Sequence, residues 1–201
     1  MAKLILVRHG ESEWNAKGLW TGWTDISLTE KGRQEARNAA QKIIPVLPDV
    51  AFTSNLKRAQ QTLDEIKTVL HCENIPTFTS KTLNERDYGD LTGKNKWKIK
   101  EEFGEEQFML WRRSFDAKPP HGESLRDVYN RVVPYYTEKI LPELEKGMNV
   151  IIAAHGNSLR ALVKYLENIS DEDIAKLEIA TGEVYLYEID SQGKITSKNI
   201  L

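Results

Sequence analysis

The sequence has few of the features that mark specialised classes of protein. Cys72 is its only cysteine among 201 residues, so no disulfide can form within the chain and a reducing compartment is expected. No apolar run approaches the roughly 18 residues that a membrane helix needs. The 28 basic and 30 acidic residues give a net charge of -2. This balance argues against nucleic-acid binding driven by bulk charge, but it permits a local basic pocket.

The amino terminus also lacks the pattern of a targeting signal. A lysine precedes apolar residues, as in a signal peptide, but the apolar run covers only Leu4–Val7 and Arg8 ends it. The chain has no repeat, low-complexity segment or linker-like stretch. We therefore expect one domain over residues 1–201, in a cytoplasmic protein with neither nucleic-acid nor membrane partners.

Short apolar runs alternate with amphipathic segments along the chain. The runs Leu4–Val7, Val50–Ser54 and Asn149–Ala154 resemble strands that are buried on both faces, as in a parallel sheet. Helical spacing of apolar residues follows each of the last two runs. This alternation predicts an α/β fold, a three-layer α/β/α sandwich with a mostly parallel central sheet.

Several local signals refine this prediction. The segment Ser27–Glu30 has the form of a capping box, and the helix after it should carry an apolar stripe that extends to Ile44 and Leu47. Residues 122–144 should be mostly helical, with a kink at Pro134. The segment Glu183–Lys198 should form a hairpin.

Two of the predicted strands end in a histidine followed by a glycine. Leu4–Val7 leads into Arg8, His9 and Gly10, and Asn149–Ala154 leads into His155, Gly156 and Asn157. The middle strand ends close to Arg58. Because ligands of open α/β sheets bind at the carboxyl ends of the strands, we expect two histidines and two arginines to meet there. Helix N-termini at the same edge would add N–H donors for an anion.

A zinc site is an alternative interpretation, since two histidines and a glutamate are common zinc ligands. Arg8 lies beside His9, however, and Arg160 follows closely after His155. These arginines would oppose a cation, whereas they suit a phosphate group. A phosphate site without a metal is therefore the favoured interpretation.

The tetrapeptide HGES occurs twice, at His9–Ser12 and at His121–Ser124. The second copy follows two prolines instead of a strand, and Asp127 lies three residues after Ser124, as in a capping box. We predict that the second copy caps a helix. Whether Glu123 faces the pocket is left open.

The motif RHGESEWN at Arg8–Asn15 resembles the signature of the histidine phosphatase superfamily. The segments LWTGWTDISLTEKG, LNERDYGDLTGKNK, WRRSFDAKPP and AAHGNSLRAL are similar to those of its cofactor-dependent phosphoglycerate mutases. The resemblance runs from about Leu4 to Tyr187. It implies an isomerase of glycolysis and gluconeogenesis that interconverts 3-phosphoglycerate and 2-phosphoglycerate. The resemblance also implies priming by 2,3-bisphosphoglycerate, small phosphorylated three-carbon acids as partners, and no metal.

The resemblance further implies roles for individual residues. His9 matches the histidine that becomes phosphorylated, and His155 matches the second histidine beside the transferring phosphoryl group. Arg8 and Arg58 match its arginine ligands, and Glu85 matches the proton donor and acceptor. Other positions match those that bind the phosphate or carboxylate of the substrate: Ser12, Asn15, Thr21, Gly22, Arg86, Tyr88, Lys96, Arg112, Arg113, Gly156 and Asn157.

Some of these residues have simpler interpretations. Arg112 and Arg113 are adjacent, so on a plain helix they would point apart and could face solvent. Lys96 lies among four lysines, which weakens its individual assignment. Trp14, Trp20 and Trp23 are expected to pack against other side chains and not to contact the substrate.

The chain departs from the longer members of the family at two places. Only the segment Ala117–Leu125 stands where they have an insertion that takes part in subunit contacts, so we expect a monomer, with a dimer as the alternative. The chain stops at Leu201, where they have a mobile tail over the pocket. We therefore expect poorer exclusion of water and more phosphatase side activity than in a tailed form.

Two other functions compete with the mutase interpretation. One is a phosphatase or bisphosphoglycerate synthase on the same fold, whose rates relative to the mutase cannot be predicted from these motifs. The other is an inactive module that binds phosphopeptides. Such a module would have lost a catalytic residue, whereas His9, Arg58, Glu85 and His155 are all present.

Overall fold

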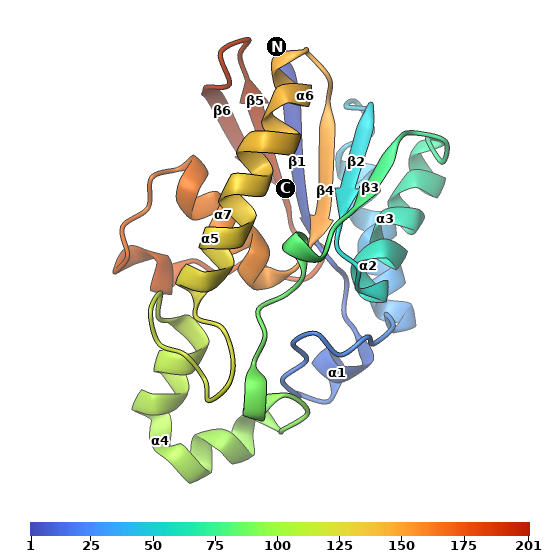
Figure 1. Cartoon of the computed structure of the whole chain (residues 1–201). Coiled ribbons are helices and arrows are strands. Elements are labelled where there is room, and N and C mark those ends of the chain that lie inside the picture. Colours follow the sequence, from blue (N-terminus) through green and yellow to red (C-terminus); the bar gives the residue numbers. More distant parts are fainter.

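The computed structural model describes all 201 residues (Figure 1). A six-stranded sheet with the order β3-β2-β4-β1-β5-β6 runs through the molecule. Its parallel strands are β1 (Ala2–Arg8), β2 (Val50–Thr53), β3 (Thr77–Thr79) and β4 (Val150–Ala154). The antiparallel strands β5 (Val184–Ile189) and β6 (Ile195–Ile200) form the predicted hairpin at one edge. The prediction of a mostly parallel sheet in an α/β sandwich is confirmed.

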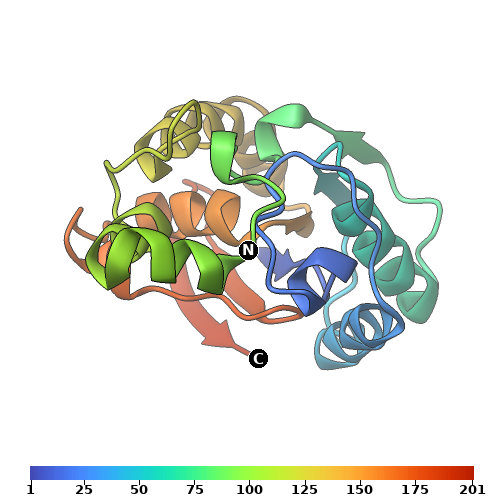
Figure 2. The same cartoon turned by 90° about the horizontal axis from the view of Figure 1, so that it is seen from below.

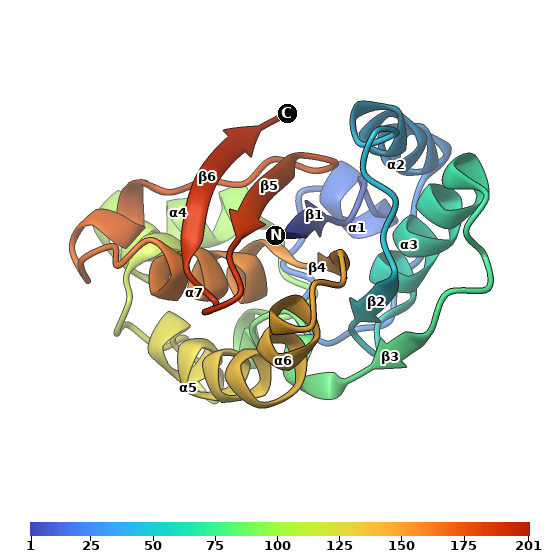
Figure 3. The same ribbon diagram turned by 90° about the horizontal axis from the view of Figure 1, so that it is seen from above.

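Helices cover both faces of this sheet (Figure 3). One face carries α2 (Glu30–Lys42) and α3 (Lys57–Leu70), and the other carries α5 (Leu125–Tyr135), α6 (Leu141–Glu145) and α7 (Gly156–Leu166). Successive side chains of a strand point to opposite faces. Accordingly, Leu4 and Leu6 of β1 belong to the core under α5 and α7, while Ile5 and Val7 belong to the core under α2 and α3. This division explains the unbroken apolar run.

A third group of elements lies beyond the carboxyl ends of the parallel strands (Figure 1). It contains α1 (Glu13–Ala16) and α4 (Lys96–Arg113), which are nearest the viewer in Figure 2. Trp20, Ile99, Phe108 and Trp111 pack there into a small separate apolar cluster. The remaining short helices are η1 (Lys81–Leu83), η2 (Gly89–Leu91), η3 (Tyr136–Ile140) and η4 (Asp173–Lys176). No helix of the molecule has both the length and the apolarity that a membrane crossing requires.

The predicted capping box at Ser27–Glu30 is wrong. The N-cap of α2 is Thr29, whose hydroxyl accepts the N–H of Gly32 at 3.0 Å. The predicted apolar stripe is also too long, because Ile44 and Leu47 are exposed. The helix ends at Lys42, shortly before Pro45, and a residue that precedes proline is disfavoured in helical conformation.

The second HGES copy caps a helix as predicted. The Ser124 hydroxyl accepts the N–H of Asp127 at 3.1 Å, and the Asp127 carboxylate accepts the N–H of Ser124 at 2.8 Å. Pro134 lies inside α5, and the π-helical η3 follows it before α6 completes the helical stretch. A wider turn of this kind accommodates an interruption of the α-helical hydrogen bonds.

The loop after β1 is pressed against the first turn of α2. A Cβ atom on Gly32 would lie 2.1 Å from the carbonyl oxygen of Glu11, and one on Gly10 would lie 2.0 Å from the carbonyl oxygen of Gly32. Only glycine at both positions permits this approach. The contact fixes the backbone that immediately follows His9.

Gly32→Ala should therefore destabilise the protein. Alanine normally stabilises a helix interior by about 1 kcal/mol relative to glycine, but here its methyl group would overlap backbone, and overpacking costs roughly 1–3 kcal/mol or more. We expect a net loss of at least about 1 kcal/mol in the free energy of unfolding, measured with urea. The exposed Gln41→Ala on the same helix is the control. Wild-type stability for Gly32→Ala would contradict the close contact.

Candidate active site

The two histidines meet because β1 and β4 are parallel neighbours. The backbone N–H of His9 donates to the carbonyl of Ala154 at 2.9 Å, which places His9 beside the residue before His155. The imidazole centroids are 4.9 Å apart at an interplanar angle of 61°. Both side chains are buried. The predicted convergence at the strand ends is therefore present in the structure.

The orientation of His9 leaves one ring nitrogen available. Nδ1 lies 2.7 Å from the carbonyl oxygen of Gly10. A carbonyl only accepts, so we assign the ring proton to Nδ1 and a free lone pair to Nε2. Burial, followed by the charges of Arg58 and Arg8, holds the pKa of His9 well below its ordinary value. A neutral imidazole with a free lone pair is a competent nucleophile.

His155 has the opposite tautomer. Its Nε2 lies 2.7 Å from the hydroxyl oxygen of Ser54, which also accepts the N–H of Leu56 at 3.1 Å. The Ser54 hydroxyl makes no other hydrogen bond in which it could donate, so we assign its proton to the contact with Nε2 and the ring proton of His155 to Nδ1. This buried Nδ1 has no partner. Burial, then the charges of Arg58 and His9, keeps the pKa of His155 well below its ordinary value, so the ring is a neutral N–H donor.

Arg8 and Arg58 surround the histidines without being neutralised by a directly bonded carboxylate. Arg58 is buried and donates to the carbonyls of Thr24 at 2.9 Å and Gly22 at 2.8 Å. Arg8 donates to the carbonyl of Ile179. The Nε atoms of both arginines have no partner, and burial lowers the pKa of Arg58 to about 10. Their positive charge and free donors are available to an anion.

Glu85 is held with one carboxylate oxygen fixed. Its Oε1 accepts the backbone N–H groups of Arg86 at 2.8 Å and Asn157 at 3.1 Å. Its carbonyl accepts from the indole of Trp23 at 2.6 Å and from Arg131 at 3.0 Å. No hydrogen bond engages Oε2, and the side chain lines the cavity described next. Glu85 can therefore exchange a proton with a bound molecule.

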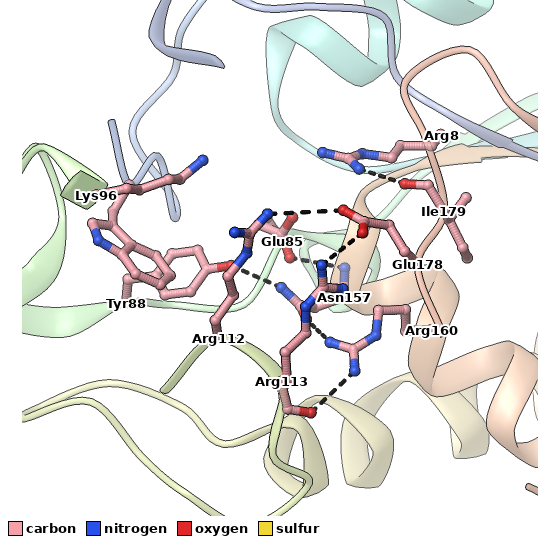
Figure 4. A pocket seen from close by; sticks show the side chains of 12 residues that line it. Arg8, Glu85, Tyr88, Lys96, Arg112, Arg113, Asn157, Arg160, Glu178 and Ile179 are labelled. Atoms are coloured by element: carbon pink, nitrogen blue, oxygen red, sulfur yellow. Dashed lines mark hydrogen bonds and ion pairs between the residues drawn. The ribbon is translucent and has the colours of Figure 1, made fainter. Parts of the chain in front are cut away.

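A cavity with two lobes occupies this end of the sheet, and Figure 4 shows its outer part. The inner lobe, of about 50 Å³, is lined by Arg8, His9, Asn15, Thr21, Arg58, Glu85, Tyr88 and Lys96. The outer lobe, of about 90 Å³, is lined by Arg8, Trp20, Glu85, Tyr88, Lys96, Arg112, Arg113, Gly156, Asn157, Arg160, Glu178 and Ile179. Both lobes are lined mainly by polar and cationic side chains, which suits a small, multiply charged anion.

The kink in α4 brings distant cations to the outer lobe. A straight 18-residue helix is about 27 Å long, so residues at its two ends could not line one small cavity. Gly104, with φ of 81°, interrupts the helix, and Lys96, Arg112 and Arg113 all line the lobe. Burial, followed by the charges of Arg112 and Arg8, lowers the pKa of Lys96 to about 8. The mutual repulsion of these cations, which Glu178 offsets in part, favours the binding of an anion.

Three of the predicted binding residues do not line the cavity. Ser12 caps α1 and its hydroxyl donates to the Asn15 side chain at 2.9 Å. The carbonyl of Gly22 accepts from Arg58. Arg86 is fully buried, with its guanidinium 4.8 Å from the ring centre of Tyr88. Each of them contacts a residue that does line the cavity, and direct binding by these three residues stays a prediction.

Four residues line the outer lobe beyond the predicted catalytic and binding residues: Trp20, Arg160, Glu178 and Ile179. The sequence indicated only that Arg160 would lie near a phosphate, and not what it contacts. Arg160 donates to the Asn157 side-chain oxygen at 2.9 Å, and Asn157 donates to the Tyr88 hydroxyl at 2.8 Å. The i,i+3 spacing of Asn157 and Arg160 on α7 could have indicated this pair. Trp20 both packs and lines the cavity. Glu178 also lines it, and no motif signalled this residue.

Glu123 supports the loop that carries Glu85 instead of facing the cavity. Glu123 does not line the cavity. Its carboxylate binds Arg131 through two hydrogen bonds of 2.9 Å and accepts the N–H of Asp87 at 2.9 Å. Arg131 in turn donates to the carbonyls of Asn84 and Glu85, each at 3.0 Å. The second HGES copy thus supports the backbone that carries Glu85.

The zinc interpretation finds no support in this arrangement. No group of three or more histidine, cysteine, aspartate or glutamate side chains in the structure is placed to hold a metal ion. One nitrogen of each ring is hydrogen-bonded, to Gly10 for His9 and to Ser54 for His155. The charges of Arg58 and Arg8 act on both rings and would oppose a cation.

Comparisons with known proteins agree with the geometry. The family model of the histidine phosphatase superfamily (branch 1) matches residues 4–200. The chain is 50% identical over 197 residues to the 2,3-bisphosphoglycerate-dependent phosphoglycerate mutase of Bradyrhizobium diazoefficiens, covering 97% of this chain and 95% of that protein. It is 51% identical over 197 residues to the protein of the same name from Cytophaga hutchinsonii, covering 98% and 92%. The solved structure of Bacillus stearothermophilus YhfR superposes with a TM-score of 0.84 at 26% identity, covering 97% and 94%.

Ser54→Ala should change the tautomer of His155. Without the hydroxyl proton, Nε2 loses its donor and the preference for a proton on Nδ1 should fall, which ¹⁵N NMR of the imidazole nitrogens detects. Loss of this buried hydrogen bond should also cost about 1–3 kcal/mol in stability. Ser54→Thr keeps a hydroxyl group and should retain the wild-type pattern. An unaltered Nδ1–H signal in Ser54→Ala would refute the assignment.

Stability should fall as the pH drops below about 6.5. The unfolded chain protonates its histidines near that pH, whereas folded His9 and His155 have lowered pKa values and stay neutral. The unfolded state then binds more protons, so acid favours unfolding by up to about 1.4 kcal/mol per pH unit for each histidine. Urea unfolding at pH 7, 6 and 5 measures this slope. His155→Asn should reduce it, and an equal slope in that variant would contradict the explanation.

Proposed function

The chain belongs to the histidine phosphatase superfamily, and within it we propose that the protein is a 2,3-bisphosphoglycerate-dependent phosphoglycerate mutase. It is an isomerase of glycolysis and gluconeogenesis that interconverts 3-phosphoglycerate and 2-phosphoglycerate. The observation that carries the proposal is the identity of about half of all residues, over nearly the full chain, to relatives with this name. The alternative, a phosphomonoester phosphatase, is less well supported by these relatives.

The two-lobed cavity supports a substrate with two anionic groups. Arg8 and Arg58 lie beside His9 in the inner lobe, and Arg112 and Arg113 line the outer lobe. A phosphoglycerate carries a phosphate and a carboxylate that would use both sets. A simple phosphatase needs strong anion ligands only around the transferred group.

The unpartnered donors also suit 2,3-bisphosphoglycerate, which has one phosphate for each lobe. Arg8 and Arg58, with their free Nε atoms, would hold the inner phosphate, and Lys96, Arg112 and Arg113 the outer one. When bound, this compound supplies the phosphoryl group that primes the enzyme. In the proposed mechanism, Nε2 of His9 receives that group through its free lone pair.

Arginines and His155 stabilise the transfer. Phosphoryl transfer depends mostly on positioning and on stabilising the charge of the equatorial oxygens. Arg8, Arg58 and the Nδ1–H of His155 provide fixed donors for these oxygens in a buried setting, where such donors act strongly. The lowered pKa values of both histidines keep His9 nucleophilic between transfers and keep His155 a neutral donor.

Glu85 accepts the proton of the acceptor hydroxyl and later returns it. When phosphorylated His9 donates its group to the hydroxyl of a bound phosphoglycerate, the carboxylate of Glu85 takes the hydroxyl proton. The proton returns from Glu85 when the phosphoryl group on the other carbon passes back to His9. The two bonds at Oε1 hold the carboxylate in place while Oε2 remains available.

Further residues of the cavity and its surroundings would position the substrate. Asn15, Thr21, Tyr88, Gly156 and Asn157 would orient the substrate, and Ser12, Gly22 and Arg86 would support them. We further propose that residues 1–201 form one catalytic domain, that the protein acts as a monomer, and that it works in the cytoplasm, where glycolysis takes place.

Synthase and phosphatase activities would accompany the main reaction whenever water or a different acceptor reaches phosphorylated His9.

The decisive test is conversion of 3-phosphoglycerate to 2-phosphoglycerate in the presence of a chelator, with and without catalytic 2,3-bisphosphoglycerate. We expect chelator-resistant isomerisation that the bisphosphate stimulates. His9→Asn should abolish phosphoenzyme formation, and Glu85→Gln should lower the isomerisation rate by about 10²–10⁴. His121→Asn, in the exposed second HGES copy, is the matched control and should retain activity. Phosphate release without isomerisation would instead identify a phosphatase.

A further inference from the structure

The outer lobe contains an acidic side chain that the proposed mechanism does not use. The Glu178 carboxylate lies 2.7 Å from the Arg113 guanidinium and 3.8 Å from that of Arg112 (Figure 4). Both arginines are proposed to hold the outer anionic group of the substrate. Glu178 therefore pairs with the donors that the substrate would use.

Ile179, the residue after Glu178, also presents an oxygen atom to an arginine of the cavity. The carbonyl oxygen of Ile179 accepts a hydrogen bond from Arg8 (Figure 4). Two consecutive residues thus present oxygen atoms to arginines of both lobes.

We propose that Glu178 is a specificity-determining residue that stands in for the outer anionic group of the substrate. The inference rests on the proposed function. Glu178 pairs with Arg112 and Arg113 and leaves them when a ligand carboxylate or phosphate arrives. Each binding event then exchanges one ion pair for another, which weakens the hold on the ligand and favours its release.

The surroundings of Glu178 permit this exchange. Its side chain is 59% exposed, and it lies between η4 and β5, outside any helix or strand. The carboxylate can therefore turn into solvent without unpacking the core. Burial raises the pKa of Glu178, but the hydrogen bond and charge of Arg113 outweigh it and keep the pKa below its ordinary value. The displaced group is thus an anion at neutral pH.

A purely structural role for Glu178 would change ligand affinity in the opposite direction. If Glu178 served to hold Arg112 and Arg113 in their binding geometry, its removal would weaken ligand binding. If it stands in for the ligand, its neutralisation strengthens binding. The gain should be largest for 2,3-bisphosphoglycerate, whose outer phosphate carries more charge than the carboxylate of 3-phosphoglycerate. Inorganic phosphate, which needs only the inner lobe, should gain little.

Calorimetric dissociation constants of the full chain test the proposal. We expect Glu178→Gln to tighten binding of 2,3-bisphosphoglycerate about two- to tenfold, since exposed ion pairs are individually weak. The gain should be smaller for 3-phosphoglycerate and absent for inorganic phosphate. Glu172→Gln, which removes an exposed acid from the neighbouring turn, should bind all three like the wild type and controls for net charge.

The outcomes separate this inference from the proposed function. If the wild type isomerises phosphoglycerate but Glu178→Gln binds the bisphosphate equally or more weakly, the stand-in role is overturned and the function stands. An equal gain for all three ligands, or the same gain in Glu172→Gln, overturns it as a general charge effect. If the wild type neither isomerises nor binds the phosphoglycerates, the proposed function fails, and the inference fails with it.

Discussion

The site depends on the parallel pairing of β1 with β4. The register sets Arg8 against Ala154, so the chain leaves both strands at the same level and His9 and His155 emerge side by side. Side chains alternate between the two faces of a strand, so a slip of one residue would turn His9 away from His155 and reverse the apolar set of β1. Burial of Leu4–Val7 on both faces opposes such a slip. The packing of the sheet core thus fixes the geometry of the histidine pair.

Around that pair the protein gathers buried cations that stability alone would not favour. Arg58 is satisfied by neutral carbonyls, and the Nε atoms of Arg8 and Arg58 have no partner. Burying charge without an opposite charge is costly, and the lowered pKa values of Arg58 and Lys96, to about 10 and about 8, reflect this cost. An anion that enters the cavity relieves it. This unfavourable burial of charge would add to the binding energy of the phosphate proposed to enter the site.

The parts that could be predicted from sequence are those that depend on local pattern or on strand ends. The apolar runs indicate the parallel strands, and the glycine after each histidine marks where the backbone turns toward the site. Residues such as Glu178 could not be predicted, since only tertiary packing brings its segment against α4. The kink at Gly104 was missed for a related reason: an isolated glycine does not reveal that both ends of its helix serve one cavity. The misplaced cap of α2 shows that neighbouring Ser27 and Thr29 are both suitable capping residues, and tertiary contacts with Glu11 select the second.

The two HGES tetrapeptides show how context decides chemistry. In the first copy, the strand before it buries His9 among arginines, and its serine caps α1. In the second copy, His121 is exposed, Ser124 caps α5, and Glu123 binds Arg131. Arg131 then holds the carbonyl of Glu85, so the second copy supports the backbone from which the Glu85 carboxylate extends. Identical residues thus place one imidazole, the proposed nucleophile, in a buried cationic setting and leave the other exposed on a structural turn. The difference arises because only the first copy follows a strand end.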